Sequence, residues 1–163
     1  MPLWLFHHTK DAFSIEDKEK IAKGMANIYT TFGLPGFFAH CQFVELDQGS
    51  FWSGGKQPDH HSCTIGIYHA AASIRNPEEG EMFLKALDDV LRPVLRPKDI
   101  RWESNVHETP PDLWRLQGMA VPGFGTELFK KWVERDGFTA QEEEDLLRQQ
   151  GYFDDSRWKL PTF

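Results

Sequence analysis

The second residue of the chain has the clearest potential for chemistry. Pro2 opens an apolar run, residues 2–8, that is typical of a strand beginning at the chain terminus. If the initiator Met1 is removed, the Pro2 nitrogen becomes a secondary amine at the start of a sheet. A free α-amino group titrates near pH ~8, and burial among apolar groups lowers that pKa. Such an amine could act as a base, an acid or a nucleophile. The alternative is that Pro2 has no chemical role, because many proteins begin with Met-Pro.

The other reactive side chains do not form a catalytic or metal-binding pattern. The chain has seven histidines and two cysteines. The adjacent histidine pairs at 7–8 and 60–61 would point to opposite faces of a strand, which does not suit a shared metal ion. Cys41 and Cys63 lie in apolar strand-like runs, so we expect buried free thiols. No phosphate loop or nucleophile elbow is present, and we expect no metal and no cofactor.

Composition and charge narrow the class of protein. The 163 residues correspond to one ordinary domain, and 40% hydrophobic residues are enough for a globular core. A net charge of -7 without a basic stripe argues against nucleic acid as a partner. We find no signal-peptide pattern and no apolar run long enough to span a membrane, so we expect a cytoplasmic protein without a membrane partner.

The apolar pattern predicts two copies of a strand–helix–strand unit, over residues 2–46 and 62–106. In each unit a helix with apolar residues three and four positions apart connects two strands. Ser14 with Asp17, and Asn76 in the second unit, supply the helix starts. Such units pair their strands in parallel and place the helix on one face. The sequence therefore predicts an α+β (α/β) fold, a duplicated β-α-β structure with a four-stranded sheet and two helices on one face.

The boundaries and the buried faces follow from the same pattern. We expect strands at 2–8, 37–46, 63–69 and 100–106, and we expect Pro93 and Pro97 to close the second helix. Two helices leave the other face of the sheet bare, so we expect oligomerisation to cover it. The helix residues predicted to face the sheet are Ile21, Ala22, Met25, Ile28, Tyr29 and Phe32 in the first helix and Phe83, Leu84, Leu87, Val90 and Leu91 in the second.

The character of the chain changes after the second unit. We expect a main domain over residues 1–122, with Trp114 as an anchor, and a C-terminal helical extension over 123–163. Short helices are predicted at 126–135 and 139–150, the second one with a capping box. Since the tail keeps four large aromatic residues, we expect it to pack on the body or on a neighbouring subunit. These are Tyr152, Phe153, Trp158 and Phe163.

Several motifs, taken in this order, carry a family resemblance. They are Met-Pro-Leu-Trp at 1–4, Ile-Tyr-Thr-Thr-Phe-Gly-Leu-Pro at 28–35, Phe-Val-Glu-Leu with the following glycines at 43–56, Ile-Arg-Asn at 74–76, and Glu-Thr-Pro-Pro-Asp-Leu-Trp-Arg at 108–115. The set resembles the tautomerase superfamily. The branch it is most similar to is the fungal oxalocrotonate-tautomerase-like proteins, which are related to cis-3-chloroacrylic acid dehalogenase. The resemblance covers roughly residues 2–120.

The resemblance implies a duplicated β-α-β fold, a homotrimer and an amino-terminal Pro as the catalytic residue. In the dehalogenase branch a protonated Pro delivers a proton, two arginines bind the substrate carboxylate, and a His, a Tyr and a Glu position or activate water. Pro2 matches the catalytic Pro and Arg75 matches the second arginine, whereas the first arginine falls on Ala72. Much of the water-activating set is missing, so the resemblance implies dehalogenase, hydratase or decarboxylase activity that is weak at best.

The remaining family positions fall on residues of other types. The helix His falls on Tyr29, and the Tyr falls near Ser104 or Asn105. The Glu falls near Leu116, beside Arg115 and Gln117. This gives Pro2, Tyr29 and Asn105 as candidate catalytic residues and Arg75, Arg115 and Gln117 as candidate substrate-binding residues.

Each candidate also has a structural alternative. Arg75 could hold a carboxylate bidentately or serve the start of the second helix. Tyr29 could donate a hydrogen bond or be a core residue, and Arg115 could replace the missing arginine or pair with Asp112.

Three functions remain open on the sequence. The first is a trimeric tautomerase in which Pro2 moves a proton on a small 2-oxo or unsaturated carboxylic acid. The second is a non-catalytic trimeric binding protein that has lost most of these residues. The third is a dimeric, cofactor-free oxygenase of the ferredoxin-like barrel type, which would not need a free Pro2.

Overall fold

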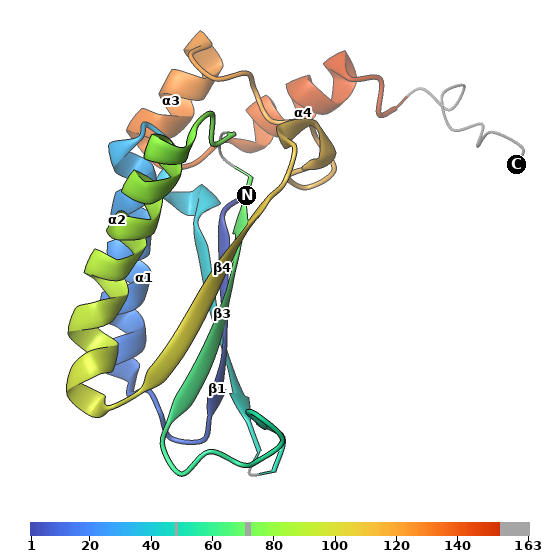
Figure 1. Cartoon of the computed structure of the whole chain (residues 1–163). Coiled ribbons are helices and arrows are strands. Elements are labelled where there is room, and N and C mark those ends of the chain that lie inside the picture. Colours follow the sequence, from blue (N-terminus) through green and yellow to red (C-terminus); the bar gives the residue numbers. More distant parts are fainter. Residues whose placement is uncertain (48, 71–72, 154–163) are drawn as a thin grey trace, which may run out of the picture. The chain divides into compact units, whose positions relative to one another are not determined.

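The computed structural model describes residues 1–47, 49–70 and 73–153 and divides into two compact units, Met1–Pro111 and Asp112–Phe163. The elements are shown in Figure 1. In chain order they are β1 (Leu3–Thr9), α1 (Ile15–Thr31), η1 (Gly36–Phe38), β2 (His40–Leu46), β3 (Ser62–His69), α2 (Pro77–Leu95), η2 (Arg96–Lys98), β4 (Arg101–Glu108), η3 (Pro111–Leu113), α3 (Glu127–Arg135) and α4 (Ala140–Gln149).

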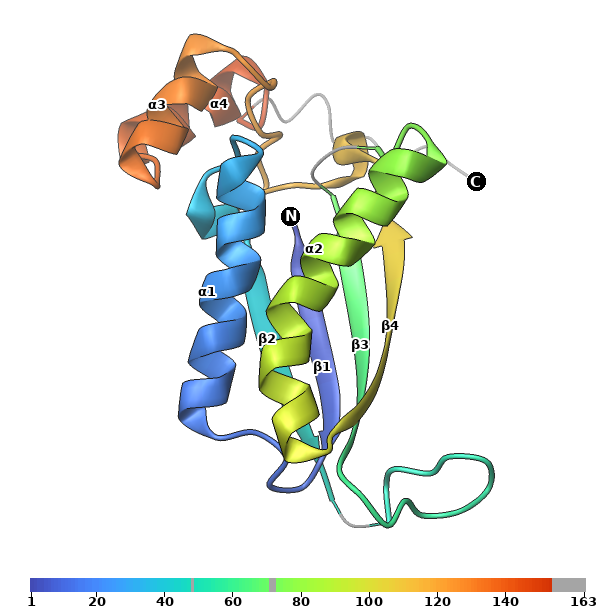
Figure 2. The same cartoon turned by 60° about the vertical axis from the view of Figure 1, so that its left-hand side comes forward.

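The first unit is a four-stranded sheet with two helices on one face. The strand order is β2-β1-β3-β4. β1 pairs with β2 in parallel and β3 pairs with β4 in parallel, whereas β1 and β3 are antiparallel. In both views α1 and α2 lie side by side on the same face of the sheet (Figures 1 and 2). Each half is one β-α-β unit, so the predicted duplicated α+β fold is confirmed.

The hydrophobic core lies between the sheet and the helices. Side chains alternate along each strand, and those of Trp4, Phe6, Ile65 and Ile67 are fully buried. The alternate residues of β1, such as Leu5, are only half-buried. The helices of the first unit therefore leave the other face of the sheet uncovered.

The helix starts form as the sequence predicts. The Ser14 side chain accepts a hydrogen bond from the backbone N–H of Asp17, and the Asp17 carboxylate accepts one from the N–H of Ser14. Asn76 Oδ1 accepts a hydrogen bond from the N–H of Glu79 at 2.9 Å. Both side chains satisfy backbone donors that have no partner inside the helix.

Several predicted boundaries and buried positions are wrong. β2 begins at His40, because residues 36–38 form a 3₁₀ turn that buries Phe38. Pro93 lies inside α2, which continues because Leu91 and Leu95 are both fully buried on its apolar face. Two residues placed on the buried helix faces are exposed. They are Phe32 (61%), which lies just past the last turn of α1, and Leu84 (43%), which is rotated away from the stripe through Phe83 and Leu87.

The second unit contains the two predicted short helices. Thr126 caps α3, and Thr139 with Glu142 forms a capping box at the start of α4. The Arg135 guanidinium donates to both carboxylate oxygens of Glu142, at 2.8 and 3.3 Å, and holds the pKa of that carboxyl at about 2. The two tail aromatics Trp158 and Phe163 lie outside the described residues. No helix in the described ranges has both the length and the apolar character needed to cross a bilayer.

The two helices of the first unit come close together at Gly24. A Cβ added at Gly24 would lie 2.8 and 3.0 Å from the two methyl carbons of Val90 on α2. Glycine inside a helix costs roughly 0.5–1 kcal/mol relative to alanine. Its presence is explained by the space that Val90 occupies.

We therefore expect the effect of Gly24→Ala to change sign with the residue at position 90. In the wild-type chain the substitution should lower the free energy of unfolding by about 1 kcal/mol, because overpacking outweighs the gain in helix propensity. In a Val90→Ala background it should leave that free energy unchanged or raise it. Denaturant titration of the four proteins measures both effects, and stabilisation by Gly24→Ala alone would show that the helices are not in close contact there.

Candidate active site

The candidate active site lies at the end of the sheet where β1 begins and where β3 and β4 end. The Pro2 carbonyl accepts a hydrogen bond from the N–H of His40 at 2.9 Å, which ties the starts of β1 and β2 together. The N–H of Thr109 donates to the carbonyl of His69 at 2.9 Å, which ties the ends of β3 and β4. α2 begins at this same end (Figure 2). The starts of β1, β2 and α2 and the ends of β3 and β4 therefore lie at the same end of the sheet as Pro2.

The amino terminus is partly buried at this end. Pro2 is buried, and the Met1 amino group lies 3.5 Å from the carbonyl oxygen of Ala70. Desolvation lowers the pKa of the Met1 amine to about 5. An amine in this setting is neutral at pH 7 and can accept a proton. With Met1 in place the Pro2 nitrogen is an amide, so the same property passes to Pro2 only when Met1 is removed.

Arg75 stands at the start of α2 with an available guanidinium. Its side chain is 81% exposed, and Nε lies 3.9 Å from Glu79 Oε1. No residue in the described ranges accepts a hydrogen bond from this guanidinium. Asn76 caps the helix, and Arg75 contributes only its backbone N–H, which donates to Glu79. An ion pair this long and exposed is weak, so the guanidinium is available to bind an anion.

Tyr29 lies beneath this end of the sheet as a core residue. It is 1% exposed, and its hydroxyl accepts a hydrogen bond from Trp4 Nε1 at 3.2 Å. Its ring lies 5.9 Å from the ring of His69 and 6.2 Å from that of Phe83. Burial raises its pKa to about 12, so the phenol keeps its proton. The hydroxyl still has a proton to donate, which leaves open the predicted role of orienting a substrate oxygen.

Asn105 lies on the face of the sheet that the helices leave uncovered. It pairs with Gly66, which pairs with Leu5. It lines a hollow of about 440 Å³ on that face together with Tyr68 and His107, whose rings stack at 5.2 Å. Within one chain the structure therefore does not bring Asn105 to the side of the sheet on which Tyr29 lies.

The other two candidates, Arg115 and Gln117, belong to the second unit. The Arg115 guanidinium donates to the backbone carbonyls of Asp112 and Trp114 at 2.8 and 2.9 Å, so it contacts the main chain of Asp112. With its amide turned so that the nitrogen faces the carboxylate, Gln117 donates to Glu143 Oε1 at 3.2 Å. Both side chains thus have local partners within their own unit.

Two residues at the site were not among the sequence candidates. His69 is buried, with its ring 4.6 Å from that of Phe83. Glu108 Oε1 accepts a hydrogen bond from the N–H of Ile74 at 2.6 Å, although the two residues are 34 positions apart. Both are the last residues of their strands. The topology could have pointed to them, because β3 and β4 end at the same end of the sheet as the start of β1.

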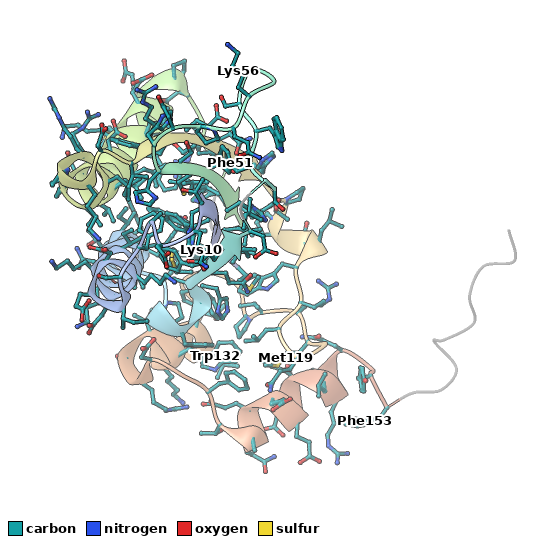
Figure 3. The ribbon with its side chains drawn as sticks, turned by 90° about the horizontal axis from the view of Figure 1, so that it is seen from below. Lys10, Phe51, Lys56, Met119, Trp132 and Phe153 are labelled. Atoms are coloured by element: carbon teal, nitrogen blue, oxygen red, sulfur yellow. The ribbon has the colours of Figure 1, made fainter. Side chains whose placement is uncertain are left out.

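A second hollow lies at the opposite end of the sheet. It has a volume of about 420 Å³ and is lined by Thr9, Lys10, Phe51, His60 and His61, among others. Figure 3 looks toward this end of the first unit and labels Lys10 and Phe51. The Asp59 carboxylate lies 2.7 Å from His60 Nδ1, and this contact lowers the pKa of Asp59.

The thiols and potential metal ligands offer no alternative centre in the described part of the chain. Cys41 and Cys63 are free thiols, and burial raises the pKa of each to about 12. Cys41 is half-buried, less than predicted, because β2 is an edge strand. Among residues 1–47, 49–70 and 73–153, no group of three or more His, Cys, Asp or Glu is arranged to hold a metal ion.

Comparison with known proteins identifies the family. The chain belongs to the family described as putative oxalocrotonate tautomerase enzymes, whose sequence model matches residues 1–137. A search of curated proteins finds no match.

Solved structures agree with this assignment. A probable enzyme from the thermophilic fungus Aspergillus fumigatus is 36% identical, with a TM-score of 0.79 over 85% of this chain and 96% of that one. RhCC from Rhodococcus jostii RHA1 is 25% identical, with a TM-score of 0.79 over 84% and 98% of the two chains. A member of the cis-3-chloroacrylic acid dehalogenase family, at 18% identity, has a TM-score of 0.56 over 90% and 99%, which shows a shared fold.

The buried pair of Trp4 and Tyr29 allows a direct test of the core beneath the site. Tyr29→Phe should lower the free energy of unfolding by about 1–3 kcal/mol, because it leaves the Trp4 N–H buried without an acceptor. Tyr152→Phe is the matched control, since Tyr152 is 47% exposed and lies outside the sheet, and the substitution should change that free energy by less than about 0.5 kcal/mol. Equal effects of the two substitutions in denaturant titration would contradict the hydrogen bond.

Proposed function

We propose that this protein is a tautomerase that uses the Pro2 amine, after removal of Met1, to move a proton on a small 2-oxo or unsaturated carboxylic acid. The observation that carries the proposal is the amino terminus, where desolvation lowers the pKa of a chain-terminal amine to about 5. Arg75, whose guanidinium is available, closely precedes α2, and α2 begins at the same end of the sheet (Figure 2). Membership of an oxalocrotonate tautomerase family supports the reaction class.

The proposed reaction uses the Pro2 amine as a base and the Arg75 guanidinium as the group that binds the carboxylate. Arg75 binds the substrate carboxylate bidentately and fixes the orientation of the acid. The neutral Pro2 amine takes the proton from the enol oxygen on C2 of the acid. It then delivers a proton to C3, the other carbon of the enol double bond, which gives the keto acid without net change in the enzyme. Tyr29 is the candidate for orienting the enol oxygen from beneath. Asn105 would have to come from a neighbouring subunit, because it lies on the other face of its own sheet.

The proposed assembly is a homotrimer in the cytosol. The face of the sheet opposite the helices carries half-buried apolar residues such as Leu3 and Leu5, and neighbouring subunits would cover it. Two free thiols suit a reducing compartment. A non-catalytic binding protein with the same fold is the alternative, and the available cation of Arg75, close before the start of α2, favours the enzyme.

Removal of the Pro2 ring should abolish most of the activity. We expect Pro2→Ala to lower the rate of phenylenolpyruvate tautomerisation by a factor of about 10² or more, because the primary amine that remains lacks the ring that holds the nitrogen in position for proton transfer. Intact mass should show that Met1 is absent from the active wild-type protein. An unchanged rate, or full activity in a protein that retains Met1, would sink the assignment.

The pH dependence has a definite sign. Desolvation lowers the pKa of the Met1 amine to about 5, and we expect a Pro2 amine at the same partly buried end to have a lowered pKa as well, so that it is neutral near pH 7 and becomes protonated in acid. The value of kcat/KM should therefore be flat near pH 7 and fall as the pH drops through the lowered pKa. A rate that rises toward acid would show that protonated Pro2 is the active form.

Loss of the Arg75 guanidinium should weaken substrate binding. Arg75→Ala should raise KM about tenfold to a hundredfold. Arg75→Lys should give a KM between those of the wild type and Arg75→Ala, because its ammonium still attracts the carboxylate as a point charge. Arg101→Ala is the matched control, because it removes the same charge at the opposite end of β4. Equal KM values for Arg75→Ala and Arg101→Ala would argue against carboxylate binding by Arg75.

A further inference from the structure

The position of the Arg75 guanidinium depends on its backbone. The side chain projects into solvent, and its nearest carboxylate lies 3.9 Å away. Few side-chain contacts therefore fix where the guanidinium stands. The point at which it meets an anion is set by whatever holds residues 74–76.

Two carboxylates hold this segment through adjacent backbone N–H groups. Glu79 accepts from the N–H of Arg75 at 3.0 Å, and Glu108 accepts from the N–H of Ile74 at 2.6 Å. Glu79 belongs to α2 and so fixes Arg75 only relative to its own helix. Glu108 is the last residue of β4 and fixes the segment relative to the sheet.

The sheet gives Glu108 a rigid base. Glu108 pairs with His69 in the parallel ladder of β3 and β4, and the following N–H, that of Thr109, donates to the His69 carbonyl. β3 pairs in turn with β1, which begins just after Pro2. On the helix side, Ile74 Cγ2 lies within van der Waals reach of Gly80, at 3.6 Å from the site of an added Cβ. Within the described residues, the segment is thus held to α2 by packing and by Glu79, and to the sheet by the Glu108 carboxylate.

We propose that Glu108 is a positioning residue that fastens the Arg75 segment to the end of β4 and so sets where the guanidinium binds the substrate carboxylate. This inference rests on the proposed function, in which Arg75 is the carboxylate-binding residue. Glu108 acts through the N–H of Ile74 and does not need to touch the substrate. A hydrogen bond to a charged acceptor is stronger than a neutral one, which suits a single point of attachment.

The first test needs no substrate. Trypsin can cleave the bond after Arg75, and mass spectrometry can follow that bond alone. Glu108→Ala should speed the cleavage about tenfold, because loss of one hydrogen bond of this kind raises the population of the detached segment by roughly that factor. Glu108→Gln should cleave at nearly the wild-type rate, since its amide oxygen can still accept from Ile74. Glu78→Ala is the matched control, because it removes an equal charge from the exposed start of the same helix.

The second test measures the consequence for phenylenolpyruvate. Glu108→Ala should raise KM about tenfold with kcat within about twofold of wild type, whereas Glu108→Gln should keep most of the affinity. Equal cleavage of Glu108→Ala and Glu78→Ala overturns the fastening. Faster cleavage with an unchanged KM overturns the positioning role and leaves the proposed function standing. A wild type without turnover overturns the proposed function, and with it the role of Glu108 in substrate binding.

Discussion

The antiparallel pairing of β1 with β3 is the constraint on which the site depends. Each half of the first unit is a parallel β-α-β unit, and a parallel pair brings two strand starts together at one end. Because the halves are joined antiparallel, the start of β1 meets the end of β3. The end of β3 also leads directly into the segment that carries Arg75 and opens α2. A parallel junction would have sent that segment to the far end of the sheet, away from Pro2.

The same arrangement gives this end of the sheet an asymmetric environment. Beneath it lie the buried aromatic rings of Trp4, Tyr29 and Phe83, which exclude water. Beside it are the start of a helix and a guanidinium, both of which carry positive charge. Desolvation disfavours a protonated amine and is the cause of the lowered pKa of the Met1 amine. The positive groups also favour an anionic ligand, so one set of features suits both a neutral amine and a bound carboxylate.

The sequence predicted local features well and tertiary ones less well. The two capping boxes and the Asn76 cap were correct because they depend on residues within four positions of each other. The passage of α2 through Pro93 was missed, because burial of Leu91 and Leu95 outweighs a local helix-breaking preference. Glu108 was missed for a related reason, since its partner Ile74 is 34 residues away and only the pairing of four strands brings them together. Of the six candidate site residues, Pro2 and Arg75 could be assigned to one end of the sheet from topology alone. The roles of Asn105 and Arg115 could not be predicted in this way, because Asn105 lies on the other face of the sheet and Arg115 belongs to the second unit.

The duplication also makes the two ends of the sheet equivalent in construction. The N–H of His40 donates to the carbonyl of Pro2 at 2.9 Å, and the N–H of Arg101 donates to the carbonyl of His61 at the same distance. His61 thus precedes β3 as Pro2 precedes β1, and His61 borders a hollow. However, the His61 nitrogen is a peptide amide, because the second half continues from the first, and an amide is not a base. Fusion of two halves into one polypeptide therefore keeps the two-fold geometry of the fold. The main-chain nitrogen can become an amine at the Pro2 end of the sheet but not at the His61 end, so the two ends share a structure and differ in reactivity.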